Sequence, residues 1–123
     1  MVPFQEANEM RAILINPWFK EVKEVQIGTD FGEITKQLCN PLGPKVDIFC
    51  IGHQFDNGDV LYVDDEGLLK SGMRLFDIGR LDGSPMAGNG LILGSTSDGD
   101  SQDAQSSLVD IQLFVKWTNL ITR

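Results

Sequence analysis

The chain has 123 residues, enough for one domain, and 18 acidic against 10 basic residues give it a formal net charge of -8. Its hydrophobic fraction of 41% is far too high for a disordered chain, and the composition excludes collagen, a disulfide scaffold and a coiled coil. The small share of Lys and Arg argues against electrostatic binding to the phosphate backbone of a nucleic acid over a broad surface. We therefore expect no direct nucleic-acid binding.

The sequence also predicts the compartment. No window approaches the roughly 18 consecutive apolar residues that a membrane-spanning helix needs. The first ten residues, MVPFQEANEM, carry two acids and lack the cationic start and apolar stretch of a signal peptide. These features predict a cytoplasmic protein without a membrane partner. Cys39 and Cys50 are then expected to be free thiols, since a disulfide between them would require export.

The first elements are predicted from local patterns. Residues 1–9 form a polar, flexible leader, and residues 10–123 form a single domain. The apolar run within residues 11–16 predicts a buried strand, and the mixed apolar and charged residues 18–27 predict a half-exposed strand pairing with it. A capping-box pattern then opens a short helix over residues 30–38.

Later segments complete the predicted domain. The β-branched, apolar residues 46–51 are the best candidate for a central strand, and an Asn-Gly turn leads into a strand over residues 60–63. Residues 88–94 predict a buried strand bracketed by glycines. Ser107 begins a final helix with a broad apolar face. That face consists of Leu108, Ile111, Phe114, Val115 and Trp117.

Taken together, the elements predict an α+β domain. It has a mostly antiparallel sheet of five or six strands and two packing helices. The segments 91–93 and 114–121 are strongly apolar for so small a chain. We expect a second copy of the chain to cover part of them, which favours a homo-oligomer.

Motifs for catalysis and metal binding are weak. Tyr62-Val63-Asp64-Asp65 copies a polymerase metal-binding tetrad, but the chain has no room for a polymerase palm and fingers. Residues 98–103 fail the spacing of an EF-hand, and Cys50 with His53 would need borrowed carboxylates to hold zinc. We expect no catalytic residue, no metal and no cofactor, and an enzyme is the less favoured interpretation.

Two sets of residues are candidate binding sites. Acidic residues without neighbouring bases and aromatic residues beside turns predict a partner-binding surface. It consists of Trp18, Phe55, Tyr62, Asp64, Asp65 and Glu66. Three cations in the glycine-rich middle of the chain predict an anion site. They are Lys70, Arg74 and Arg80. The plain alternatives are core aromatics and solvated turn carboxylates.

Three segments occur in a distinctive order: Met10–Ile15, Val60–Leu68 and Met86–Gly94. Their order and spacing resemble a small uncharacterised family of proteins from bacteriophages and bacterial mobile elements. In that family a strand Y-V-[ND]-[ED]-E-G precedes an apolar strand G-N-x4-G. The resemblance covers about residues 10–116. The chain departs from the pattern by having Asp-Asp where Asn-Glu is commoner, and by its leader, which makes Met10 an alternative start.

The resemblance implies a context and no catalytic residue. A protein carried by a phage or mobile element is expected to be a non-catalytic accessory protein that binds a host component. It would act in counter-defence, either by inhibiting a host defence protein or by sequestering a small nucleotide signal. Two alternatives stay open: an acidic nucleic-acid mimic that blocks a DNA-binding host protein, and a small metal-dependent hydrolase that uses Cys50, His53 or the acidic turns.

Overall fold

The computed structural model describes residues 9–79 and 84–123 of the chain. The main sheet consists of β1 (Glu9–Asn16), β2 (Glu21–Gly28), β3 (Phe49–Gln54), β4 (Val60–Asp64), β7 (Gly90–Ser95) and β8 (Ser101–Gln102). A smaller sheet consists of β5 (Arg74–Asp77), β6 (Met86–Ala87) and β9 (Lys116–Ile121). The helices are α1 (Phe31–Leu38), α2 (Leu108–Phe114) and the short 3₁₀-helix η2 (Gly67–Leu69).

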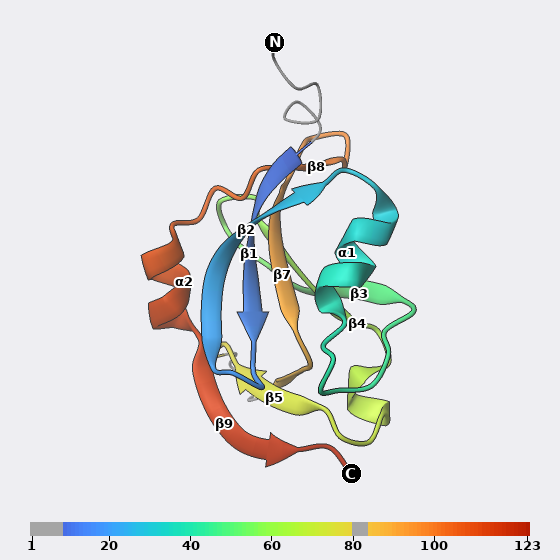
Figure 1. Cartoon of the computed structure of the whole chain (residues 1–123). Coiled ribbons are helices and arrows are strands. Elements are labelled where there is room, and N and C mark those ends of the chain that lie inside the picture. Colours follow the sequence, from blue (N-terminus) through green and yellow to red (C-terminus); the bar gives the residue numbers. More distant parts are fainter. Residues whose placement is uncertain (1–8, 80–83) are drawn as a thin grey trace.

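The main sheet has the strand order β2-β1-β7-β4-β3, with β8 paired to the end of β7 (Figure 1). Every pair in it is antiparallel. The smaller sheet, in the order β6-β5-β9, is antiparallel as well. The predicted α+β fold, with a mostly antiparallel sheet and two helices, is therefore confirmed.

Both faces of the main sheet are covered. On β1, Ala12 and Leu14 pack with Ile34 of α1, whereas Ile13 points to the opposite face and packs with Ile111 of α2. Figure 1 shows α1 and α2 on opposite sides of β1 and β7. Because side chains alternate along a strand, a strand buried on both faces needs an unbroken apolar run. This is why residues 13–15 and 91–93 contain no polar residue.

The strand predicted to be central lies at the edge of the sheet, so that prediction was wrong. β3 begins at Phe49 and pairs with β4 alone among the described strands. A register shift between Ile51 and His53 interrupts this pairing. Val46 is buried in the α1-side core, while Ile48 and Ile51 are exposed. An apolar run indicates that a segment forms a strand. Whether that strand is central or at the edge depends on the order in which the strands pair.

The predicted final helix ends earlier than its apolar pattern indicates. Ser107 caps it as expected, because its hydroxyl accepts a hydrogen bond from the backbone N–H of Asp110 (3.1 Å). Val115 is extended, and Trp117 lies on β9 opposite Phe76 of β5. Trp117 still packs in the same core cluster as Ile111. Of the predicted apolar face, Ile111 and Val115 are buried, whereas Phe114 is 36% exposed. The residues after the helix reach the core with strand geometry.

Three smaller expectations also differ. Glu9 already belongs to β1, and the rest of the predicted leader, residues 1–8, lies outside the described residues. The capping box of α1 does not form, because Glu33 accepts from the backbone N–H of Gly28 instead (3.2 Å). Of the two segments that favoured a homo-oligomer, 91–93 is fully buried, whereas the segment 114–121 has exposed apolar residues.

Three buried asparagines join the end of β1, the segment after α1 and the start of β7. The Asn40 amide donates to the side-chain oxygens of Asn16 (3.0 Å) and Asn89 (3.2 Å). Asn89 in turn donates to the carbonyl of Gln37 at the end of α1 (3.1 Å). This network fixes α1 against one face of the sheet.

A second buried polar group, Asp59, anchors the segment that leads to α2. Its side chain is fully buried at the start of β4. It accepts hydrogen bonds from the backbone N–H of Gln105 (2.9 Å), the backbone N–H of Ser106 (2.8 Å) and the Ser106 hydroxyl (2.6 Å). A buried carboxylate with three donors is a strong anchor, because charge-assisted hydrogen bonds exceed neutral ones in strength.

We predict that Asp59→Asn lowers the free energy of unfolding by about 2–4 kcal/mol. The carboxylate accepts hydrogen bonds from two N–H groups and a hydroxyl. The NH2 group of asparagine would face one of these donors and could not accept from it. Asp56→Asn in the neighbouring exposed turn is the control, expected to change stability by about 0.5 kcal/mol or less. Urea unfolding of both variants measures this, and equal effects would contradict the anchoring role.

Candidate functional site

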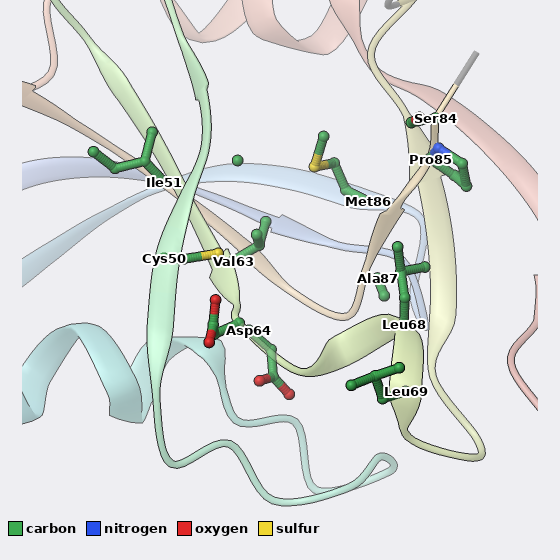
Figure 2. Close-up of a pocket in the computed structure, with 12 residues that line it drawn as sticks. Cys50, Ile51, Val63, Asp64, Leu68, Leu69, Ser84, Pro85, Met86 and Ala87 are labelled. Carbon is green, nitrogen blue, oxygen red and sulfur yellow. The ribbon is translucent and has the colours of Figure 1, made fainter. Parts of the chain in front are cut away.

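A cavity of about 370 Å³ opens beside the edge strand β3. β3 and the end of β4 form one side, and η2 with the segment through β6 forms the other. Figure 2 shows Cys50 and Ile51 at one side and Leu68 and Leu69 at the opposite side, with Met86 between them. We call this hollow the η2 cavity.

The exposed wall of the η2 cavity is apolar. Leu69 is 85% exposed and Leu68 60%. Ile51, which is 52% exposed, lies on the β3 side, and its side chain points away from the two leucines in Figure 2. Single exposed leucines are common, but two adjacent ones at the rim of one hollow form a feature that needs explanation. η2 holds the two leucines in place because Gly67 allows it to approach β6, where a Cβ on Gly67 would lie 3.0 Å from that of Ala87.

The opposite wall carries a thiol beside two carboxylates. Desolvation raises the pKa of Cys50, and a hydrogen bond to Asp65 and the negative charges of Asp65 and Asp64 raise it further. All three effects oppose formation of the thiolate, which is the reactive form of cysteine. The Cys50 thiol is therefore a poor nucleophile at neutral pH.

Asp64 has a structural role at the base of this wall. Its side chain is only 1% exposed and accepts from the Lys70 ammonium at 2.7 Å. Its other oxygen accepts from the backbone N–H of Glu66 (2.9 Å), and Lys70 also donates to the carbonyl of Lys45 (2.7 Å). The ion pair closes the turn between β4 and η2. Asp64 is thus no exposed contact residue, although sequence predicted one.

Two of the three cations of the predicted anion site, Lys70 and Arg74, lie within the described residues. The charge of Lys70 is compensated by Asp64. Arg74 is half-buried on β5, opposite Ile121 of β9. Arg80 lies outside the described residues.

The predicted partner-binding residues separate into different places. Asp65 lines the η2 cavity, and Glu66 is exposed next to it. Trp18 is half-buried, and its ring lies so close to Gly43 that a Cβ there would be 2.3 Å away. Phe55 packs edge-on against His53, with ring centroids 4.7 Å apart. Tyr62 lies on the other face of the sheet, packed against Phe49.

The two leucines of η2 were not among the residues that the sequence singled out for binding. The available signal was their position, directly after Asp64-Asp65-Glu66-Gly67. Two adjacent large apolar residues after an acidic turn cannot both be buried on one face of a strand.

No group of three or more His, Cys, Asp or Glu side chains in residues 9–79 and 84–123 is placed to hold a metal ion. Both cysteines are free. Among the described helices, none has the length and apolar character to cross a membrane. Comparisons with protein-family models, curated proteins and solved structures find no match.

The environment of Cys50 leads to a prediction about its reactivity. In a Cys39→Ser background, Asp65→Asn replaces the carboxylate by a neutral amide, which removes a negative charge that raises the pKa of Cys50 and weakens the hydrogen bond from its thiol. The thiolate fraction near pH 8 should rise, and alkylation by iodoacetamide should become about two- to tenfold faster. Mass spectrometry over a pH series measures the rate.

The control variant is Asp47→Asn, which changes the net charge equally at an exposed position outside the η2 cavity. It should leave the rate of Cys50 alkylation nearly unchanged. An unchanged or slower rate in Asp65→Asn would show that Asp65 does not set the reactivity of Cys50.

Proposed function

We propose that the protein is a non-catalytic accessory protein that binds a host protein at the η2 cavity. The observation that carries this proposal is the pair of exposed leucines, Leu68 and Leu69, beside the carboxylates of Asp65 and Glu66. An apolar centre with a charged rim is the usual composition of a protein-binding surface. The partner would present a segment with apolar side chains flanked by Lys or Arg.

The apolar part of this surface would supply most of the affinity. Each large aliphatic side chain that becomes fully buried contributes about 1.5–3 kcal/mol. The leucines of η2 are already held in position by the turn that Asp64 and Lys70 close. Little ordering cost would therefore oppose binding at these two residues.

The charged part would select the partner. The chain has a net charge of -8, and Asp65 and Glu66 are exposed at the rim. These charges favour approach of a basic surface and disfavour an acidic one, and they do so less as salt rises. A host defence protein as the partner follows from the resemblance to phage and mobile-element proteins.

Direct inhibition of a protein has more support than nucleotide sequestration or hydrolysis. Sequestration of a small nucleotide needs a free cation, and Lys70 is paired with Asp64. A thiol-dependent hydrolase needs a reactive thiolate, and the surroundings of Cys50 raise its pKa. Lys70 therefore does not support nucleotide sequestration, and Cys50 does not support hydrolysis.

The proposal is tested by affinity capture with the double variant Leu68→Ser/Leu69→Ser. Immobilised wild-type protein should retain a defined bacterial host protein, and the double variant should retain at least about tenfold less of it. Leu113→Ser/Leu120→Ser is the matched control, because these leucines are also exposed but lie on α2 and β9. Quantitative mass spectrometry of the bound fractions provides the measurement.

Charge reversal adds an independent check. Asp65→Lys/Glu66→Lys should abolish capture of the same protein, and raised salt should elute it from the wild type. Retention that is equal for wild type and both cavity variants would place the interaction elsewhere and refute the proposal.

A further inference from the structure

A second cavity, of about 390 Å³, lies on the opposite face of the main sheet from the η2 cavity. Tyr62 and Phe49 line it, whereas their chain neighbours Val63 and Cys50 line the η2 cavity. Side chains of consecutive strand residues point to opposite faces, so the two hollows are separated by the sheet itself. We call this one the Tyr62 cavity.

The walls of the Tyr62 cavity are apolar and aromatic. The rings of Phe49 and Tyr62 meet edge to face, with centroids 5.3 Å apart and an interplanar angle of 85°. Met10 of β1 and Ile34 of α1 are buried beside them. Small-molecule sites are hollows of similar volume, lined mainly by apolar and aromatic groups with a few polar ones.

The polar groups come from one end of the sheet. The turn between β7 and β8 contributes Asp100, and the segment before α1 contributes Thr29. Figure 1 shows this turn and the start of α1 at the same end of the main sheet. Two hydrogen bonds between Thr96 and Asp100 hold the turn: Thr96 N–H to the Asp100 carbonyl (2.8 Å) and Asp100 N–H to the Thr96 hydroxyl (3.0 Å).

The charge of these groups determines which ligand fits. Asp100 is the ionisable acid of the lining, and none of the lining residues described is basic. A phosphate or carboxylate ligand would meet a negative charge there, and no positive charge among the lining residues would offset it. An ammonium group would be attracted by the carboxylate and by the faces of the aromatic rings, which favour cations.

We propose that the Tyr62 cavity binds a small organic cation, an arylalkylamine. The aromatic body packs against Phe49, Tyr62 and Ile34, and the ammonium group pairs with Asp100. This site is separate from the η2 cavity and does not depend on the proposed protein partner.

The experiment uses the full chain and tryptamine as the probe, followed by NMR. Tryptamine should shift the methyl signals of Met10 and Ile34 in a saturable manner. Indole-3-acetate, which has the same ring and the opposite charge, should not shift them. No saturable shift up to on the order of 10 mM tryptamine, or equal shifts with both compounds, would overturn the proposal.

Matched variants identify the charged group. Asp100→Asn should weaken tryptamine binding about two- to fivefold, which is the effect of losing a solvent-accessible ion pair. Asp98→Asn removes an exposed acid from the same turn but not from the cavity lining, and binding should be unchanged. Equal affinities for wild type and Asp100→Asn would show that Asp100 does not hold the amine.

Discussion

The amide network of Asn16, Asn40 and Asn89 is the constraint on which the arrangement of the domain depends. Asn16 ends β1, Asn89 directly precedes β7, and the neighbouring residues Ile15 and Gly90 are paired between these two strands. Asn40 donates to both amide oxygens, so the network forms only when β1 and β7 are in this register. A slip by one residue would leave buried amides unpaired and would exchange the two faces of each strand. The same contacts hold the end of α1, through Gln37, against the sheet.

Once this register is set, the positions of both cavities follow. β4 pairs with β7, and β3 pairs with β4, so alternate residues of β3 and β4 are distributed to two faces. On one face the η2 cavity lies beside η2, and on the other the Tyr62 cavity lies between α1 and the β7–β8 turn. Each hollow combines an apolar wall with a carboxylate, from Asp65 in one and Asp100 in the other. Acidic side chains thus lie at two separate cavities. Their negative charge would favour positively charged ligands at both.

Sequence predicted the features that depend on short-range pattern: the buried runs of β1 and β7, the start of α2 at Ser107, and the overall fold class. It failed where long-range pairing decides. The edge position of β3 depends on strand order, and Trp117 entered a strand because β5 offered a partner, although its spacing fits a helix equally well. At the candidate site, the exposed carboxylate of Asp65 was predicted. The burial of Asp64 was not, because it requires the turn that brings Lys70 back to it.

The pairing of β1 with β7 also has a consequence for the order of folding. β1 and β2 are neighbours in the chain, so their hairpin can form early. On the other side of β1, Ile13 pairs with Ile92 of β7, which is far away in the sequence. Most of the chain must be synthesised before this contact exists, and closing so long a loop carries a large entropic cost. Until then one side of the β1 apolar run has no strand beside it. Newly made protein is therefore most vulnerable to aggregation at this hairpin, in the interval before β7 arrives.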